Sequence, residues 1–239
     1  MLTHTKYEEF KVDVYDFLIA IGVGLFYYMS QYFAAFPLEL FGIDINNLNY
    51  AIRTIYLLIF QFFVVGSIIF VYKNHLIAHF KDFQKNKDIY FKKYFKFWIY
   101  MYAATIICNA IILIINGGDI ANNQEGINEL FNINPIYVYI ASVIIAPILE
   151  ELIFRFSLRK IFKTDTLFII MSGLLFGCAH VVGQTESLID YLHIIPYSIP
   201  GFVFGYIFVK TNNIFPSICM HLFHNGITIA LQFFIMFFS

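Results

Sequence analysis

The chain has 239 residues, of which 60% are hydrophobic and 20% aromatic, while only 13% are charged. Soluble domains are about 45–50% apolar and about 25% charged, so this composition excludes an ordinary soluble domain and indicates a polytopic membrane protein in a lipid bilayer. The formal net charge is −1. Without a basic excess, nucleic acid is not an expected partner.

A membrane-spanning helix needs about 20 mostly apolar residues. Seven stretches meet this requirement. In chain order they are about Val14–Phe36, Tyr50–Tyr72, Phe97–Ile115, Ile136–Leu158, Thr166 to at least Val182, Ile194–Val209 and Ile214–Phe238. The first is expected to stop at Pro37, and the sixth, which carries Pro196 and Pro200, is expected to be short or irregular. The sequence predicts an all-α membrane fold with about seven transmembrane helices, within a range of six to eight.

Two polar intervals separate these spans. Residues 73–96 contain seven lysines and an apolar side, which predicts an amphipathic helix on the cytoplasmic surface. Residues 116–134 are rich in asparagine, lack Lys and Arg, and are expected to form a soft loop. We divide the chain into an N-terminal part of three spans, 1–134, and a C-terminal core of about four spans, 135–239.

The basic residues are distributed unevenly. With the N-terminus in the cytoplasm and alternating spans, thirteen of the fifteen Lys and Arg residues fall on the cytoplasmic side. Segments 37–49, 117–135 and 183–192, which are expected outside, contain none. This bias sets the orientation of membrane proteins. The sequence predicts a multi-pass protein of the bacterial plasma membrane, with a cytoplasmic N-terminus and its C-terminus outside.

The fourth predicted span carries two adjacent carboxylates and an arginine. Ionisable groups are costly within a bilayer and indicate a functional site by default. Glu151 and Arg155 are four residues apart, so they share a helix face and can pair. Glu150 is rotated by about 100° from Glu151 and lacks this partner. An unpaired carboxylate in apolar surroundings suits a group that takes and returns a proton. The alternative is a buried charge cluster that only locks helices together.

Two other spans carry polar residues at helical spacing. In the fifth, His180 follows Phe176 by four residues, which taken alone fits a hydrogen bond between helices as well as a catalytic role. In the seventh, Asn225 follows His221 by four residues. His224 lies between them and is expected to support the site or the fold.

Glu150, His180 and His221 are expected at similar depth. Glu150 precedes Asp165, the tip between spans four and five, by as many residues as His180 follows it. The rise of 1.5 Å per residue brings His221 to a comparable level. The sequence therefore predicts a membrane-embedded polar site formed by spans four, five and seven.

The chemistry that these residue types favour is water activation. Glu150 would deprotonate a water with help from His180, while His221 and Asn225 would donate hydrogen bonds to an oxyanion. The sequence has no His-Glu-x-x-His zinc motif. A divalent metal such as Zn²⁺, where one is used, would be held by Glu150, His180 and His221.

Three motifs in the same order resemble the CPBP family, the CAAX protease and bacteriocin-processing group of intramembrane endopeptidases, also called Abi. They are Glu150-Glu151-x-x-x-Arg155, Phe176-x-x-x-His180 and His221-x-x-x-Asn225. Pro147 and the Gly201-x-x-x-Gly205 step also match the family's pattern. The resemblance covers about residue 135 to the C-terminus. Phe156 stands where the family frequently has glycine, so this end of the helix is expected to be more regular.

The resemblance implies a catalytic set of six residues, with Glu150 as the base, Glu151 and Arg155 as its support, and His180, His221 and Asn225 as the remainder. It also implies cleavage of a peptide bond in a peptide or membrane-protein substrate, for which we expect access from the cytoplasmic side. The family is commonly described as metalloproteases.

Two other functions compete with an intramembrane endopeptidase. One is a non-catalytic membrane protein of the same fold, such as an immunity or scaffolding factor. The other is a transporter in which Glu150 and the histidines relay protons. The complete motif set argues against the scaffold, and the lack of internal repeats argues against the transporter.

Overall fold

The computed structural model describes residues 14–185 and 187–238, and all regular elements among them are helices. The main elements are α1 (Val14–Tyr32), α2 (Phe36–Glu39), α3 (Tyr50–Ile115), α4 (Asn122–Ile133), a composite helix (Pro135–Ile161), α8 (Asp165–Ala179), α9 (Ile194–Thr211) and α10 (Ile214–Phe238). Short 3₁₀ helices are η1 (Ile45–Asn47) and η4 (Ile189–His193). The predicted all-α polytopic membrane fold is confirmed.

Five helices of the described residues are long and apolar enough to cross a membrane: Val14–Tyr32, Tyr50–Ile115, Pro135–Ile161, Ile189–Thr211 and Ile214–Phe234. The sixth predicted span is therefore a full-length helix despite Pro196 and Pro200. Helix α8 is apolar but has only 15 residues, which is about 22 Å of helix.

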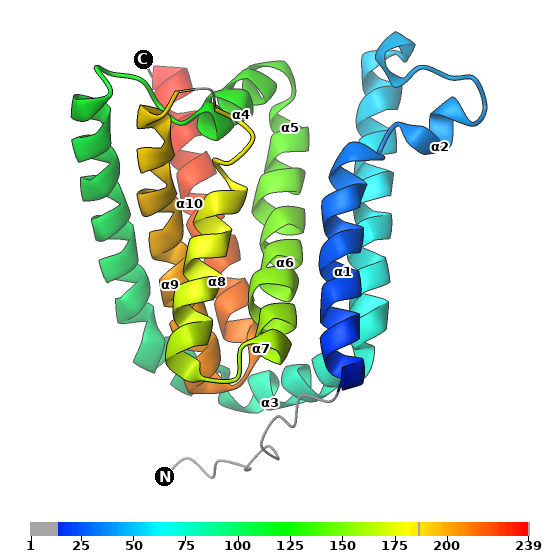
Figure 1. Cartoon of the computed structure of the whole chain (residues 1–239). Helices are drawn as coiled ribbons and strands as arrows, with labels where there is room; N and C mark the ends of the chain where they lie inside the picture. The colour runs from blue at the N-terminus through cyan, green and yellow to red at the C-terminus, as the bar shows by residue number, and fades with distance from the viewer. Residues whose placement is uncertain (1–13, 186, 239) are drawn as a thin grey trace.

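Helix α3 contains the second and third predicted spans and the interval between them. Its 66 residues would extend about 99 Å if straight, several times the ~30 Å of a bilayer core. Figure 1 shows how this length fits: α3 descends beside α1, crosses the base of the molecule, and rises again on the far side of α9. The predicted amphipathic helix at 73–96 is this crossing, and it continues into both spans without a break.

The base of the molecule is formed by the crossing of α3 and by α7 (Leu158–Ile161), and we call it the basal end. Here Asp16 of α1 pairs with the buried Lys160 of α7 at 2.6 Å. On the crossing, Leu76, Phe83 and Phe91 pack into the core, whereas Ile77 and Phe80 are exposed. Lys6 and Lys11, which the predicted orientation assigns to the same side, lie outside the described residues.

The composite helix contains the fourth predicted span and two widened π-helical segments. It consists of α5 (Pro135–Val138), η2 (Tyr139–Ile145, π), α6 (Ala146–Glu151), η3 (Leu152–Ser157, π) and α7. The expectation of a more regular helix around Phe156 is wrong, because Phe156 lies within η3. There its ring packs against Tyr72 at 4.8 Å between centroids, and Ser157 hydrogen-bonds the Tyr72 hydroxyl at 2.8 Å.

Three predicted boundaries need correction. The first span ends at Tyr32 rather than Phe36, and Phe36 is instead the first residue of the short helix α2. The fifth ends at Ala179, before Val182, because the chain turns after His180 and reaches a positive φ of 84° at Gly183. The interval 116–134 is not only a loop, since it forms α4, whose Phe131 packs against Val138 and Ile229.

Helices α8 and α9 approach each other with backbone nearly in contact. A Cβ added to Gly201 would lie 2.7 Å from Cα of Gly173, and one added to Gly177 would lie 2.2 Å from Oγ of Ser198. The predicted close approach at Gly201 is therefore present, and its counterpart is the Gly173-x-x-x-Gly177 step of α8, which the sequence analysis missed. This contact brings α9 against the polar residues of the composite helix.

Candidate active site

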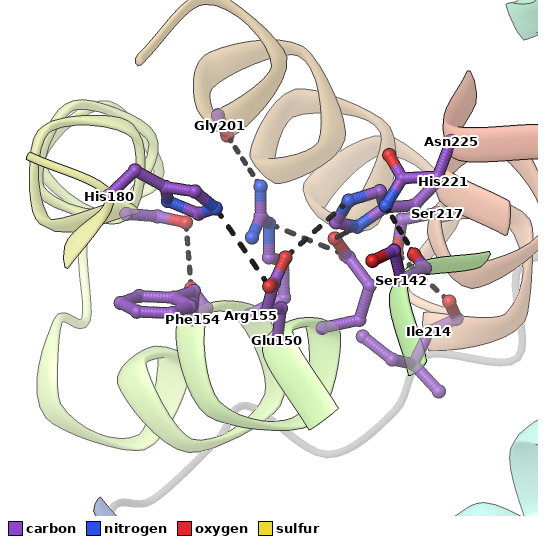
Figure 2. Close-up of polar contacts among 12 residues, drawn as sticks. Ser142, Glu150, Phe154, Arg155, His180, Gly201, Ile214, Ser217, His221 and Asn225 are labelled. Atoms are coloured by element: carbon purple, nitrogen blue, oxygen red, sulfur yellow. Dashed lines mark hydrogen bonds and ion pairs between the residues drawn. The ribbon is translucent and has the colours of Figure 1, made fainter. Parts of the chain in front are cut away.

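The six predicted site residues come together from three separate helices. Glu150 is on α6, His180 follows the last residue of α8, and His221 is on α10. Figure 2 shows the two imidazoles approaching the Glu150 carboxylate from opposite sides. The Nε2 atom of His180 lies 3.9 Å from Glu150 Oε1, and the Nε2 atom of His221 lies 3.5 Å from Glu150 Oε2. The three residues thus lie level with one another on their helices, as their predicted similar depth requires.

Glu151 and Arg155 form the predicted pair, with Arg155 Nε 3.3 Å from Glu151 Oε2 and both side chains fully buried. This pair has a third member that was not predicted. Nδ1 of His221 lies 2.9 Å from Glu151 Oε1, so one histidine contacts both glutamates. A buried ion pair needs additional hydrogen bonds to offset its desolvation, and His221 supplies one of them.

The guanidinium of Arg155 is enclosed by α8 and α9. It donates from Nη2 to the carbonyl of Gly201 at 3.3 Å. The rings of Phe176 and Phe204 face it, with centroids 4.7 and 5.6 Å from Cζ. These aromatic faces favour a cation and shield it from lipid. The close α8–α9 contact therefore provides the site in which the charge of Arg155 is held.

The hydrogen bonds of the two imidazoles assign their tautomers. Nδ1 of His180 lies 2.8 Å from the carbonyl of Phe176. A carbonyl only accepts, so this nitrogen carries the proton. Nδ1 of His221 likewise donates to Oε1 of Glu151, whose Oε2 atom pairs with Arg155. In the neutral forms of both rings, Nε2 is then an acceptor that faces Glu150.

The π-helical segments offer backbone carbonyls to neighbouring helices. Asn225 of α10 donates from Nδ2 to the carbonyl of Ser142 in η2 at 2.8 Å, as Figure 2 shows. Ser172 of α8 donates to the carbonyl of Phe154 in η3 at 2.7 Å. Widened turns are frequent at functional sites because they disturb the regular i→i+4 bonding. Here they fix α8 and α10 against the helix that carries Glu150.

A cavity of about 280 Å³ adjoins these residues. Its lining includes four predicted residues, Glu150, His180, His221 and Asn225, whereas Glu151 and Arg155 do not line it. The cavity extends to α4, whose Asn123, Gln124 and Ile127 also line it. In Figure 1, α4 lies at the end of the molecule opposite the basal end, and we call this the α4 end.

Several lining residues were missed by the sequence analysis. Tyr197 of α9 stacks on His180 with ring centroids 4.8 Å apart, and its hydroxyl accepts from Asn123 at 3.3 Å. Tyr197 lies about one turn into the sixth predicted span, and apart from its hydroxyl nothing in the sequence marks it as a site residue. The spacing of Ile127 and Phe131, four residues apart, is a signal that could have indicated a helix at α4, where a soft loop was expected.

His224 lines the cavity beside Asn225, in agreement with its expected supporting position. Its ring lies edge-on to Tyr102, with centroids 5.5 Å apart, and near Trp98 and Phe204. Its Nδ1 atom is buried and makes no hydrogen bond to the described residues. His224 therefore contributes mainly an aromatic contact between α3 and α10.

The predicted metal ligands, Glu150, His180 and His221, meet in space. In residues 14–185 and 187–238, no group of three or more His, Cys, Asp or Glu side chains has the arrangement of a metal site. The donor types do suit Zn²⁺, and each imidazole has its other nitrogen bonded to an oxygen, as is usual for metal-binding histidines. The metal stays a prediction.

Comparison with known proteins places these features in a family. A family model described as type II CAAX prenyl endopeptidase Rce1-like matches residues 132–227, which include all six predicted site residues. The chain is 32% identical over 231 residues to an uncharacterized protein of Mycoplasma capricolum, covering 88% of this chain and 67% of that protein. No solved structure matches.

Two further relatives match over shorter regions. UPF0177 protein YvdC of Lactococcus lactis is 30% identical over 134 residues, covering 55% of this chain and 49% of that protein. The "Putative membrane peptidase YdiL" of Bacillus subtilis is 28% identical over 142 residues, covering 57% and 53%. The chain thus spans about half the length of these two relatives.

The matched region contains the composite helix, α8, α9 and most of α10, which together carry every predicted site residue. Family membership supports a CAAX-type membrane peptidase and does not favour the scaffolding alternative. The chain belongs to the Rce1-like family of type II CAAX prenyl endopeptidases, which is consistent with the resemblance of its motifs to the CPBP family.

Proposed function

We propose that this chain is an intramembrane endopeptidase that hydrolyses a peptide bond of a membrane-associated protein or peptide, using a water activated by Glu150. One observation carries the proposal. The Glu150 carboxylate and the Nε2 atoms of His180 and His221 are three acceptors that converge within 3.9 Å. Acceptors repel unless a donor lies between them, and distances of this size commonly hold a bridging water.

The reaction follows from these positions. Glu150 takes a proton from the water as its oxygen bonds to the scissile carbonyl carbon, and the carbonyl electrons move onto the oxygen. His180 accepts the second hydrogen bond of the water and orients it. Asn225 uses one amide hydrogen on Ser142, which leaves the other for the oxyanion. When the C–N bond breaks, Glu150 returns the proton to the leaving amine.

Glu151 and Arg155 act through His221. The carboxylate of Glu151 fixes the Nδ1–H tautomer of His221, and Arg155 holds the other oxygen of that carboxylate. In the neutral ring, Nε2 of His221 then faces Glu150 as an acceptor, and it can accept a hydrogen bond from the proton that Glu150 takes up. This role replaces the expected hydrogen bond from His221 to the oxyanion, for which Asn225 remains as the donor. Glu151 has the orienting role that a buried carboxylate has behind a functional histidine.

A divalent metal held by Glu150, His180 and His221 would supply Lewis-acid activation of the same water. The steps above do not depend on it. Dialysis against a strong chelator, followed by assay with and without Zn²⁺, tests the prediction. Activity that is lost and then regained with Zn²⁺ supports the metal, and unchanged activity in a protein shown by elemental analysis to be metal-free contradicts it.

The substrate reaches the site from the α4 end in this proposal. The cavity is lined by α4, whereas α7 and the crossing of α3 lie at the basal end. The positive-inside rule assigns the lysine-rich basal end to the cytoplasm of a cell membrane, and with it a cytoplasmic N-terminus. The α4 end is then extracytoplasmic, which replaces the expectation of access from the cytoplasmic side.

Thiol labelling in intact cells tests this orientation. Asn123→Cys, in a chain freed of its three native cysteines, should react with a membrane-impermeant maleimide, whereas Lys85→Cys on the crossing should react only after lysis. Labelling in the reverse order would place the cavity on the cytoplasmic side.

The activity itself is tested with Glu150→Gln, which keeps the shape of the side chain and removes the base. Purified wild-type and variant chains in nanodiscs are incubated with a library of internally quenched peptides. We expect the variant to lose about 10²–10⁴-fold in rate with unchanged expression and melting temperature. Cleavage by Glu150→Gln at the wild-type rate contradicts the proposal.

A further inference from the structure

A second cavity, which we call the amide groove, adjoins the catalytic cavity. It has a volume of about 380 Å³ and lies between α3, α4 and the end of α10. Gln124 of α4 and Thr228 of α10 line both cavities. The hollow that begins at Glu150 therefore continues past these two side chains along α4.

The lining of the amide groove combines apolar side chains, Tyr102, Phe131 and Leu231, with uncharged polar ones. Four primary amides contribute to it, namely Gln124, Asn128, Asn132 and Gln232, and neither Lys, Arg, Asp nor Glu is among its lining residues. Gln124 and Gln232 both donate to Oδ1 of Asn128, at 2.8 and 2.7 Å. These two bonds fix the direction in which each amide presents its remaining donors and acceptors.

The fixed amides leave hydrogen-bonding capacity unused. Oδ1 of Asn128 already has two donors, so its amide N–H groups remain available to a ligand. Oε1 of Gln232 is buried and has no hydrogen-bond partner among the described residues. A buried acceptor without a partner is costly and calls for an explanation. A bound group that carries both N–H and C=O would pair with the N–H groups of Asn128 and with Oε1 of Gln232.

A peptide backbone has this alternation of donors and acceptors, and its charge is zero. We propose that the amide groove binds an extended, uncharged stretch of the substrate on one side of the scissile bond. This inference rests on the proposed endopeptidase function. The lining offers no cation to a terminal carboxylate, so the bound stretch is an internal segment of the substrate rather than its free C-terminal end.

A charge introduced into the groove should change which peptides are cleaved. Asn132 is exposed and takes part in neither of the two hydrogen bonds to Asn128, so Asn132→Asp adds a carboxylate without breaking them. We expect cleaved library peptides to become enriched in Lys and Arg at positions on a single side of the scissile bond, by about threefold, the size of one partly exposed ion pair.

The control is Asn122→Asp, which places the same charge on the same helix but outside the groove. It also loses the bond from Nδ2 of Asn122 to the carbonyl of Gln184 at 2.6 Å, so its melting temperature is measured alongside its cleavage profile. Its cleavage profile should equal that of the wild type. The inference is overturned if Asn132→Asp leaves the profile unchanged, or if the control shifts it equally. A wild-type chain that cleaves no peptide, in contrast, overturns the proposed function and with it the groove's assignment.

Gln232→Leu separates substrate binding from a structural role. If Gln232 contacts bound substrate, its loss should raise KM about tenfold with kcat nearly unchanged, because hydrogen-bonded recognition in the ground state is removed. A fall in melting temperature with KM unchanged would instead mean that Gln232 only ties α10 to α4, and would overturn its assignment to the substrate.

Discussion

The residues around Glu151 are held more tightly than the residues around Glu150. We call the first region the closed side and the second region the open side. On the closed side, Glu151, Arg155 and His221 are buried, with contacts of 2.9–3.3 Å. On the open side, Glu150 faces His180 and His221 across 3.5–3.9 Å and borders a cavity. Neighbouring residues on one helix thus serve different purposes. The closed side fixes geometry, and the open side leaves room for water and substrate.

Removing one charge from the closed side should have the largest effect on the fold. Arg155→Met leaves Glu151 buried beside an uncharged side chain, and breaking a buried pair in this way costs about 3–5 kcal/mol. We expect a marked fall in the free energy of unfolding and loss of activity, measured by denaturant titration in detergent and by peptide cleavage. An undiminished stability would show that Arg155 is not needed to hold Glu151.

The double variant Glu151→Gln/Arg155→Met sharpens the test. Removing both charges should recover most of the lost stability, because no unpaired charge remains. Activity should stay low, since His221 no longer has a carboxylate to fix its tautomer. Recovery of both quantities would mean that the pair does not position His221.

Helix α9 supports the closed side, and a substitution that displaces this helix should have a smaller effect on stability than Arg155→Met. The carbonyl of Gly201 accepts a hydrogen bond from Arg155, and a Cβ at Gly201 would lie 2.7 Å from Cα of Gly173. In Gly201→Ala the new methyl would displace α9, which typically costs about 1–3 kcal/mol. Gly205→Ala is the matched control, because its Cβ would meet its nearest neighbour at an ordinary 3.5 Å. Equal melting temperatures for the two variants would contradict the close contact.

The sequence predicted most of this arrangement because helix geometry is regular. The depth of Glu150, His180 and His221 depends only on the rise per residue, so counting from the polar tip sufficed. The pairing of Glu151 with Arg155 followed from i,i+4 spacing in the same way. The features that depend on the spacing of residues within one helix could therefore largely be predicted, although the ends of the first and fifth spans could not.

Features set by contacts between helices were not accessible. The bond from His221 to Glu151 depends on the rotation of α10, which spacing along α10 does not give. The π-helical turns around Ser142 and Phe154 are stabilised by side chains from other helices. Helix α4 was read as a loop from its asparagines, although burial of Phe131 outweighs their low helix propensity.

Substitution of Tyr197, which lies on the open side, should have the smallest effect on activity and stability. Its ring stacks on His180 and its hydroxyl meets Asn123 at the cavity wall. Tyr197→Phe keeps the stacked ring and removes one hydrogen bond, which is worth about 0.5–1.5 kcal/mol. We expect kcat/KM to fall about threefold to tenfold while the melting temperature stays within a degree or two of wild type, because the open side carries little of the fold's stability.

The comparison with Tyr197→Ala separates the ring from the hydroxyl. Loss of the stacked ring frees His180 to rotate away from Glu150, so activity should fall further than in Tyr197→Phe, again with little change in stability. If Tyr197→Ala instead unfolds the chain as readily as Arg155→Met, the open side is as rigidly built as the closed one. The spacing of 3.5–3.9 Å around Glu150 would then be a fixed feature of the packing rather than room kept for a water.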